Sequence, residues 1–533
     1  EAAKTFEVSV RELAEEEGFR RVGFDRGDGW RRLGLGSELH TRVLSARCEA
    51  HEGYRREVHL QARVPVEGWT AILTGRLDGC VERVAGQWLI EELKSTHLSS
   101  EGMRPAGYGF ERDRRQVLAY CYLWRRLGHP LVDGALVYVD IETGEELSFA
   151  VPYGDGEAAR QADADIERRL LRLLGIWRAQ EAARRRKAKA AERLPFPHTA
   201  PRPIQEKLIA EVRTALAQGE NLLAEAPTGS GKTAAALHPA MVHGLTTGRQ
   251  VVFLTAKTLQ QKMAVSALTA MNERAFSTIQ VRAKERMCAN DRILCHEEFC
   301  RFAKDYPEKM ARSNILGRLR DSYSHHDPDT VFEEARREEV CPFEVQLELA
   351  QRADAVVADY NYVFEPGVAM RHLTGEELGN AILIVDEAHN LPDRARQIYS
   401  PELLEEDVRA LGNSLLLQPG RLFADLVDSL DELLGVLTRA ADELPEGEAI
   451  AEIEPPAEGI RAIREEWEPR LMAYLAWKRE QKIALPDDPV LDVHFALQRF
   501  CAVLNLFGPD FTCVVERRGA GVRLALLCLD PAR

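Results

Sequence analysis

The sequence predicts an α/β protein made of several domains, and three observations lead to this expectation. The chain has 533 residues, whereas one domain usually holds roughly 100–200. Short apolar runs typical of buried parallel strands occur at 250–256, 355–364 and 381–390, with helical patterns between them. A glycine-rich turn at 226–233 follows another apolar run and opens a helical pattern, which is the context that a phosphate-binding loop needs.

Composition limits the class of protein. Lysine and arginine number 70 and aspartate and glutamate 85, so the net charge is −15. This balance excludes a wholly basic nucleic-acid coat protein but allows local basic grooves. No run approaches about 18 consecutive apolar residues, so we expect no membrane span. Ten cysteines are too few for a disulfide scaffold, which favours a reducing cytoplasm, with nucleoid association in a bacterium.

The first 180 residues predict one domain. Residues 70–96 have the pattern of a β-hairpin with its turn near Ala85–Gly86, 115–127 that of an amphipathic helix, and 161–193 that of a long helix. The proline-rich stretch 194–203 then breaks the pattern, so we expect a linker at 181–203. Its basic segment Arg184–Lys187 predicts either contacts with phosphates or a solvated helix face.

The glycine-rich turn APTGSGKT predicts a nucleoside triphosphate site. Backbone N–H groups of such a loop ring a phosphate at a helix N-terminus. The lysine adds positive charge for the β- and γ-phosphates, and the following threonine hydroxyl can ligate Mg²⁺. The strict pattern has glycine where Ala226 stands. The expected binding residues are Thr228, Gly229, Ser230, Gly231, Lys232 and Thr233.

The second half of this predicted site is VDEAH at 385–389, at the end of an apolar strand. Asp386 can hold Mg²⁺, Glu387 can orient and deprotonate the attacking water, and His389 can couple the site to DNA or to a second lobe. Gln205, upstream in RPIQEKL, fits a glutamine that senses adenine, although an ordinary surface glutamine is the alternative.

Four cysteines interrupt the α/β pattern within 284–345. Structural zinc sites usually contain two close C-x2-4-C pairs, and this stretch has no two such pairs. Four thiolates at irregular spacing favour a [4Fe–4S] cluster, with zinc or unliganded core cysteines as alternatives. The four residues are Cys288, Cys295, Cys300 and Cys341.

The order of these motifs resembles the XPD/DinG family of iron–sulfur superfamily 2 DNA helicases. FPHTAPRPIQEKLI, APTGSGKT, the cysteines, CPFEVQLELAQRADAVVADYNYVF and LIVDEAHN carry the resemblance, which covers about 196–533. It implies a RecA-like first motor lobe at 204–283, 346–390 and 506–533, an iron–sulfur domain at 284–345 and a helical arch at 391–505. The cysteine spacing departs from the close pair of the XPD pattern.

The resemblance also implies 5′→3′ movement on single-stranded DNA. The family continues beyond LCLDPAR with a second motor lobe that supplies arginines to the γ-phosphate. We therefore expect this chain to be a fragment that binds nucleotide, hydrolyses ATP slowly and does not translocate.

The hairpin of the first domain carries a second candidate site. Asp78 and Glu92 are nearly equidistant from its turn, so they should lie almost opposite each other. Glu92 and Lys94 are two residues apart and share one face of the sheet. The carboxylates can bind Mg²⁺ or Mn²⁺, and the lysine can polarise a nucleophilic water. A surface hairpin held by salt bridges is the alternative.

Further residues extend this set. His40 lies on an expected helix before the hairpin, and Gln116 and Tyr120 share one helix face. With Asp78 and Glu92-x-Lys94 they resemble the RecB-like branch of the PD-(D/E)XK nucleases over about 36–125. The resemblance implies a restriction-endonuclease-like α/β domain at 1–180, with metal bound by His40, Asp78 and Glu92. A structural histidine, a core tyrosine and a degenerate domain that only grips DNA are the alternatives.

Together these features predict an ATP-dependent DNA helicase joined to a metal-dependent DNA nuclease, acting in DNA repair or end processing. The expected partner is single-stranded or forked DNA. The expected cofactors are ATP with Mg²⁺, a [4Fe–4S] cluster, and Mg²⁺ or Mn²⁺ in the nuclease domain. Two rival functions are a helicase with an inactive DNA-binding clamp and a nucleotide-dependent DNA-binding scaffold.

Overall fold

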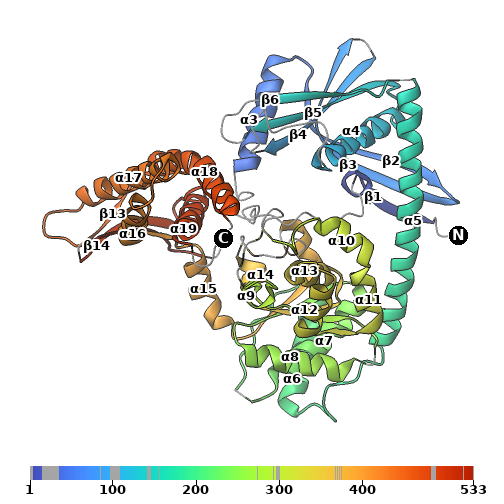
Figure 1. Cartoon of the computed structure of the whole chain (residues 1–533). Helices are drawn as coiled ribbons and strands as arrows, with labels where there is room; N and C mark the ends of the chain where they lie inside the picture. Colours follow the sequence, from blue (N-terminus) through green and yellow to red (C-terminus); the bar gives the residue numbers. More distant parts are fainter. Residues whose placement is uncertain are drawn as a thin grey trace. The chain divides into compact units, whose positions relative to one another are not determined.

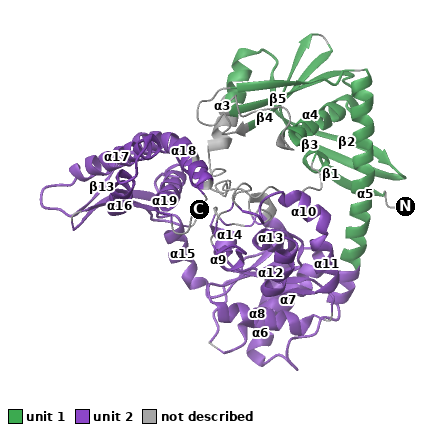
Figure 2. Ribbon diagram, viewed as in Figure 1, with its two compact units in different colours: residues 1–18, 34–185 green, residues 19–33, 186–533 purple. Residues whose placement is uncertain are grey.

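The computed structural model describes most of the chain and divides it into two compact units. The units comprise Glu1–Gly18 with Gly34–Arg185, and Phe19–Leu33 with Arg186–Arg533 (Figure 2). The described residues are 4–14, 35–84, 86–96, 108–140, 146–154, 156–227, 229–272, 274–291, 293, 295, 300–365, 368, 370, 373, 375–481, 488–519 and 521–531.

The first unit is built on a mixed six-stranded sheet in the order β1-β3-β4-β5-β6, with β2 also paired to β3. The pairs β2–β3 and β3–β4 are antiparallel, whereas β4 and β5 are parallel and are joined by helix α4 (Figure 1). The elements are β1 (Thr5–Ser9), α1 (Val10–Ala14), α3 (Leu35–Ala50), β2 (Arg55–Val66), β3 (Trp69–Val84), β4 (Gln87–Thr96), α4 (Tyr108–Arg126), β5 (Leu131–Asp140), β6 (Glu146–Val151) and α5 (Glu157–Ala191).

The predicted hairpin and both predicted helices of this unit are confirmed. β3 and β4 pair antiparallel with Gly79 opposite Glu91, which brings Asp78 and Glu92 next to each other across the ladder. Helix α4 forms because Val117, Tyr120, Cys121 and Trp124 recur at helical spacing and are all buried in the core of the unit. The same helix therefore carries two of the predicted site residues on a rigid element.

The second unit contains a parallel five-stranded sheet in the order β11-β7-β10-β8-β9. Both faces of its strands are buried: Val252 and Leu254 face one hydrophobic cluster, and Val251 and Phe253 face another. This explains the uninterrupted apolar runs in the sequence. The elements are α6 (Pro203–Gln218), α7 (Lys232–Thr247), β7 (Gln250–Leu254), α8 (Thr258–Met271), β8 (Thr278–Gln280), α9 (Lys284–Met287), α10 (Tyr306–Ser313), α11 (Ile315–Ser322), β9 (His325–His326), α12 (Pro328–Arg337), α13 (Pro342–Arg352), β10 (Ala355–Ala358), α14 (Asn361–Phe364), η2 (Gly375–Asn380), β11 (Ala381–Val385) and η3 (Ala388–Asn390).

One expectation for this unit is wrong. The apolar run before the phosphate loop does not form a strand: residues 220–227 have no regular structure, and Leu223 is 91% exposed. β11 ends the described sheet, and the run does not pair with its open side. A strand needs a neighbouring backbone for its hydrogen bonds, so apolar composition alone does not make one.

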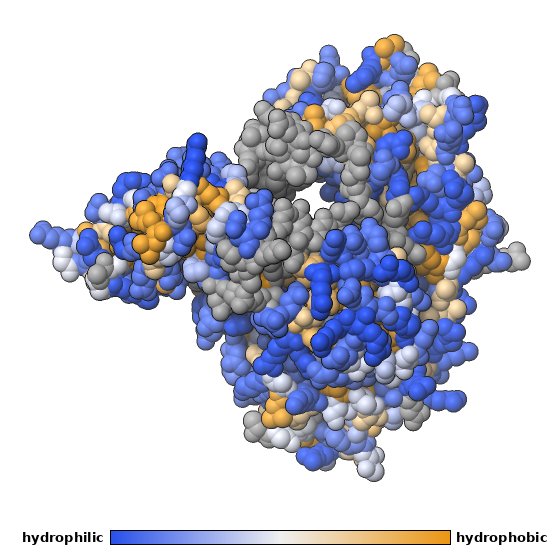
Figure 3. Space-filling model, in the orientation of Figure 1, coloured by the Kyte–Doolittle hydropathy of each residue, from blue (hydrophilic) through white to orange (hydrophobic). Residues whose placement is uncertain are grey.

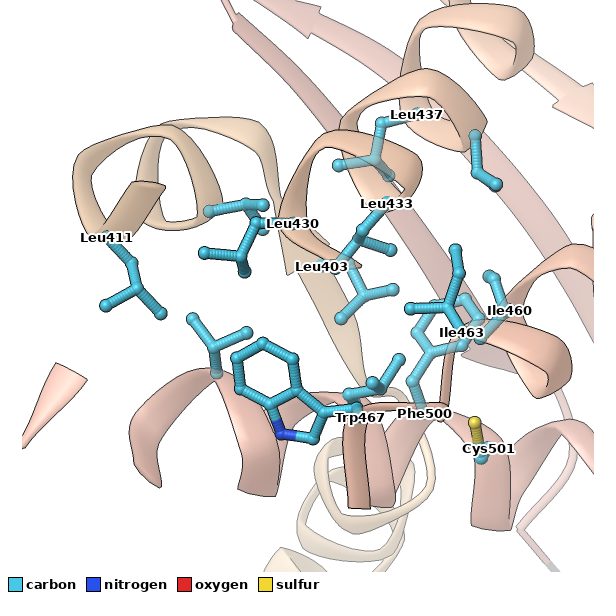
Figure 4. Close-up of a cluster of buried hydrophobic side chains, with 14 of the residues drawn as sticks. Leu403, Leu411, Leu430, Leu433, Leu437, Ile460, Ile463, Trp467, Phe500 and Cys501 are labelled. Atoms are coloured by element: carbon cyan, nitrogen blue, oxygen red, sulfur yellow. The ribbon is translucent and has the colours of Figure 1, made fainter. Parts of the chain in front are cut away.

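The segment after the DEAH motif is mainly helical, as predicted, and has its own core. Leu430, Ile460, Trp467 and Phe500 meet at its centre (Figure 4). Its elements are α15 (Leu391–Ile398), β12 (Glu402–Leu404), α16 (Glu405–Leu416), α17 (Arg421–Asp442), β13 (Ile450–Ile453), α18 (Ala457–Glu480), α19 (Pro489–Leu504), β14 (Phe511–Arg518) and β15 (Gly521–Cys528).

The expected return of 506–533 to the motor sheet is not seen. β14 and β15 instead form an antiparallel sheet in the order β12-β15-β14-β13, and Cys513 and Leu526 belong to the same core as α16–α19. β14 and β15 pair antiparallel, with Arg518 opposite Gly521. The described pairs of the five-stranded sheet are all parallel, and the β14–β15 hairpin instead shares the core of the helical segment.

The polarity of the described surface fits the high content of charged residues. In the view of Figure 3 the described surface is mainly hydrophilic, and apolar residues form separate patches. Of the helices described, none combines the length and the apolar character that a membrane crossing requires.

Candidate functional sites

The phosphate loop lies directly before α7. Gly229 and Gly231 have φ angles of 75° and 79°, a left-handed conformation that favours glycine. Gly231 caps the helix, so the N–H groups of the first turn, beginning at Lys232 and Thr233, are available to an anion. The Lys232 Nζ donates to the carbonyl of Ala226 at 3.1 Å. Thr228 lies outside the described residues.

Gln205 holds this loop to α6. Its Oε1 accepts the N–H of Arg202 at 2.8 Å, and its Nε2 donates to the carbonyl of Gly231 at 3.3 Å. A Cβ at Gly231 would lie 2.2 Å from that Nε2, and the φ of 79° is strained for any residue other than glycine. Gln205 is buried and is therefore not an ordinary surface residue. Its contact with adenine stays a prediction.

The DEAH residues Asp386–His389 follow β11, the outermost described strand of the sheet. The N–H of Asp386 donates to the carbonyl of Leu254 at 2.9 Å. Burial raises the pKa of Asp386, Glu387 adds to this effect, and Lys232 and Lys257 oppose it. Lys232 and Asp386 are thus close enough for their charges to interact, which brings both predicted halves of the nucleotide site together.

Glu387 has a φ of 52°, a conformation that is strained for a residue other than glycine and is often found at functional sites. The Nε2 of Gln260 donates to its Oε1 at 3.4 Å, and the Nδ1 of His389 lies 3.5 Å from its Oε2. His389 is otherwise exposed. The carboxylate of Glu387 is therefore held from two sides.

The sequence analysis missed Tyr360. This buried side chain donates a hydrogen bond to the carbonyl of Asp386, and its hydroxyl lies 3.3 Å from the carbonyl of Glu387. It lies two residues after the end of β10, within the run ADYNYVF, which the pattern predicted only as a strand. The available signal was a tyrosine just after a buried strand, since a buried hydroxyl needs a hydrogen-bond partner.

The four cysteines share one neighbourhood, with Cys300 and Cys341 buried and Cys288 and Cys295 half-buried. Burial raises the pKa of Cys288, and Cys295 and Cys300 raise it further. Burial also raises the pKa of Cys341 to about 12, and Cys295 contributes. Among the described residues, however, no three histidine, cysteine, aspartate or glutamate side chains are grouped closely enough to hold a metal ion.

Glu92 is the centre of the candidate site in the first unit. It is 3% exposed, and its Oε1 accepts hydrogen bonds from the Lys94 Nζ at 2.7 Å and the Gln116 Nε2 at 2.6 Å. Its Oε2 is buried and has no hydrogen-bond partner among the described atoms. Burial raises the pKa of Glu92 to about 7; Lys94 lowers it, and the charge of Asp78 raises it.

The rest of the predicted set surrounds this carboxylate. The Oδ2 of Asp78 accepts the N–H of Leu93 at 2.8 Å, and the Oε1 of Gln116 accepts a bond from Lys94 at 3.1 Å. Tyr120 donates to the carbonyl of Arg76 at 2.7 Å, and burial followed by the charge of Glu92 raises its pKa. The structure thus brings Asp78, Glu92, Lys94, Gln116 and Tyr120 together.

His40 is the exception. It belongs to α3, but its side chain lies outside the described residues, so its predicted role as a metal ligand stays a prediction. The sequence analysis also missed Asp113, a buried acid whose Oδ2 accepts a hydrogen bond from the Tyr138 hydroxyl at 2.9 Å. Its charge raises the pKa of Glu92. Its position one helical turn before Gln116 was the available signal.

Part of the second unit matches a known family model. Residues 251–408 match the DEAD_2 family model. The matched segment contains the cysteines and the DEAH motif. The chain is 24% identical over 257 residues to a protein named regulator of telomere elongation helicase 1 homolog from Oryza sativa subsp. japonica, covering 37% of this chain and 25% of that protein.

Two further likenesses were found. The chain is 24% identical over 298 residues to the ATP-dependent DNA helicase DinG of Photobacterium profundum, which covers 46% of this chain and 43% of that protein. A solved structure titled XPD_Helicase aligns with 62% of this chain and 55% of its own at 17% identity and a TM-score of 0.42. The family model and these two relatives show that part of this chain is similar in sequence to DNA helicases.

The chain spans less than half of the length of either of these two relatives. Neither of their names refers to a nuclease. The activity of the whole protein, and any activity of the first unit, are therefore proposals.

Proposed function

We propose that this chain is part of an ATP-dependent DNA helicase whose first unit is a metal-dependent DNA nuclease. The helicase would act on single-stranded or forked DNA in repair or end processing and would move 5′→3′. The observation that carries the motor half is the glycine turn at the start of α7, with Gly229 and Gly231 in the left-handed conformation and Gly231 capping the helix. Asp386 follows β11, and its charge interacts with that of Lys232.

The motor chemistry follows from these positions. The helix N-terminus at Gly231 and the charge of Lys232 suit the phosphates of ATP. Thr233 and Asp386 are the residues that would hold Mg²⁺, and Glu387, held by Gln260, would orient and deprotonate the attacking water. Burial of Asp386 strengthens its interaction with a cation, since charges interact more strongly away from water.

We propose that the four cysteines hold a [4Fe–4S] cluster. Two observations favour the donor set. Cys341 caps α13; burial raises its pKa to about 12 despite the backbone N–H groups of Phe343 and Glu344, so a bound metal would be needed to hold it as a thiolate. The Nδ2 of Asn290 donates to the Cys300 sulfur at 3.0 Å, and such bonds tune iron–sulfur clusters. A cluster would supply a rigid core or an electron carrier beside the motor.

The buried Oε2 of Glu92 is the observation that carries the nuclease half. A buried oxygen without a hydrogen bond is costly unless another group, such as a metal ion, binds it. Asp78 and Glu92 would hold Mg²⁺ or Mn²⁺, which would supply an activated water and charge stabilisation. Lys94 would stabilise the negative charge that develops on the phosphate, and Gln116 fixes both Glu92 and Lys94.

The motor proposal is tested by unwinding of a forked duplex with a 5′ or a 3′ single-stranded tail, with the whole protein and its Lys232→Ala variant. The wild type should unwind only the 5′-tailed fork, and the variant neither. Unwinding by the variant would refute the assigned site. ATP and DNA binding without any unwinding would support the scaffold alternative.

The nuclease proposal is tested with this chain on end-labelled single-stranded and forked DNA. Wild type should cut in Mg²⁺ or Mn²⁺ and stop when EDTA is added, and Glu92→Ala should not cut. Glu82→Ala, which changes an exposed acid on β3, is the matched control and should cut normally. Intact DNA binding without cleavage by the wild type would identify an inactive clamp.

A further inference from the structure

The residue that follows β7 is connected by hydrogen bonds to the proposed general base. Thr255 is fully buried, and its backbone N–H donates to the carbonyl of Ala358 at the end of β10, at 3.0 Å. Its hydroxyl hydrogen-bonds to the Oε1 of Gln260, in the first turns of α8. The Nε2 of Gln260 in turn donates to the Oε1 of Glu387 at 3.4 Å. A chain of polar groups therefore joins the rigid end of the sheet to the carboxylate.

The carboxylate determines the direction of every hydrogen bond in this chain. A carboxylate that acts as a base is ionised and only accepts hydrogen bonds, so the Nε2 of Gln260 must face Glu387. The amide then presents its Oε1 to Thr255, so the threonine hydroxyl must donate. The oxygen of that hydroxyl accepts the backbone N–H of Lys257, the N-cap residue of α8, at 3.4 Å. All the bonds therefore run one way, from the start of α8 to Glu387.

This chain occupies one oxygen of Glu387 and leaves the other for the reaction. Oε1 accepts the bond from Gln260, whereas Oε2 lies 3.5 Å from the Nδ1 of His389, whose side chain is exposed. The Glu387 side chain itself is 24% exposed, so the carboxylate is open to solvent. A base needs a hydrogen bond to the water that it deprotonates, and Oε2 is the oxygen that the chain does not use.

We propose that Thr255 and Gln260 are positioning residues for ATP hydrolysis and that they make Oε2 of Glu387 the oxygen that deprotonates the attacking water. Oε2 takes one proton from the water, and the water oxygen bonds to the γ-phosphorus. The bond from that phosphorus to the β–γ bridging oxygen breaks, and its electron pair leaves on ADP. The proposal deepens the proposed motor function and rests on it.

The test compares ATP hydrolysis by the whole protein and its variants. Gln260→Met removes the donor at nearly constant shape, so kcat should fall roughly 10–100-fold, as expected for a lost hydrogen bond to a charged group. Thr255→Val leaves the amide in place but without its anchor, so kcat should fall roughly fivefold. Neither residue is proposed to touch the nucleotide, so KM and the affinity for a fluorescent ATP analogue should stay within about twofold.

Two matched variants serve as controls. Thr255→Ser keeps a hydroxyl that can donate and should restore kcat to nearly the wild-type value. Gln261→Met changes the next glutamine of α8, whose Nε2 donates to the carbonyl of Thr255 at 3.3 Å and whose Oε1 accepts from Gln280 at 3.2 Å. This side chain has no bond to Glu387 among those described, so the variant should hydrolyse ATP like wild type. An equal loss in Gln260→Met and Gln261→Met would overturn the proposal.

A second measurement separates positioning from a merely structural role. Gln260→Met and Thr255→Val are each combined with Glu387→Gln, and the residual hydrolysis is measured in single turnovers. Both should then be silent, because the oxygen that they orient no longer takes a proton. A structural role would instead lower the residual rate by the same factor as in the wild-type background, and that result would overturn the proposal.

The positioning role and the motor function can fail separately. ATP hydrolysis by wild type that Thr255→Val and Gln260→Met leave unchanged would refute the positioning role and keep the motor. Wild-type protein that binds the ATP analogue but does not hydrolyse ATP, with or without single-stranded DNA, would refute the motor and the positioning role together.

Discussion

The two candidate centres differ in how completely hydrogen bonds from neighbouring residues fix their side chains. Around Glu92, three hydrogen bonds join a strand carboxylate, a strand lysine and a helix glutamine into a closed set. At the nucleotide site, Lys232 instead bonds to the carbonyl of its own loop, and Leu223 before that loop is exposed. Side chains that hydrogen-bond to one another are oriented before the ligand binds. A loop without such bonds loses conformational entropy when the ligand orders it. If the proposed functions hold, the centre at Glu92 should need only metal and DNA, and the nucleotide site should need its ligand to become organised.

The largest expected effect separates chemistry from binding in the motor. Glu387→Gln should slow ATP hydrolysis roughly 10²–10⁴-fold because it removes the general base, while nucleotide affinity stays within about threefold. Phosphate release and binding of a fluorescent ATP analogue measure the two quantities. DNA cleavage by the first unit should be unchanged, and its loss would show that the two centres are not independent.

A smaller effect on metal binding is expected from Gln116, whose side chain hydrogen-bonds to Glu92 and Lys94. Gln116→Leu should weaken metal affinity or cleavage roughly 10–100-fold, as loss of a supporting hydrogen bond to a ligand usually does. The midpoint of cleavage in a Mn²⁺ titration gives the number. Gln61→Leu, an exposed glutamine of β2, is the control and should titrate like wild type. If both variants behaved alike, the network would have no role in metal binding.

Tyr360 should matter less than Glu387 because it acts through backbone carbonyls. Tyr360→Phe removes one hydrogen bond of about 1 kcal/mol, so kcat for ATP hydrolysis should fall roughly fivefold at an unchanged KM. Tyr323→Phe, at a 43% exposed position, should have no effect. A change in KM with kcat preserved would assign Tyr360 to nucleotide binding instead.

The smallest expected effect tests whether residues 220–227, which precede the phosphate loop, are unpacked in solution. Leu223→Ala should change the free energy of unfolding by less than about 0.5 kcal/mol, because this side chain is 91% exposed. Leu254→Ala, at a fully buried position of β7, should cost roughly 2–5 kcal/mol. Denaturant titrations without nucleotide measure both. A cost above about 2 kcal/mol at Leu223 would show that the run is packed as a strand in solution.

The sequence predicted those parts that local patterns determine. The β3–β4 hairpin and α4 were predictable because alternation and helical spacing are local, and they also determine that Asp78, Glu92 and Gln116 meet. The predictions of a strand before the phosphate loop and of 506–533 within the parallel sheet were wrong. Both depend on which backbone lies beside the segment, and the local sequence does not show this. Asp113 and Tyr360 were missed because their roles arise from contacts 21 and 26 positions away in number, to Glu92 and Asp386.

The central claim is that one chain carries two separable centres, and one set of three proteins tests it directly. Metal-dependent DNA cleavage and binding of an ATP analogue would be measured on wild type, Glu92→Ala and Lys232→Ala. Glu92→Ala should lose cleavage and keep nucleotide binding, and Lys232→Ala should do the reverse. Wild type that binds nucleotide but cuts no DNA in Mg²⁺ or Mn²⁺, or variants that lose both properties together, would contradict it.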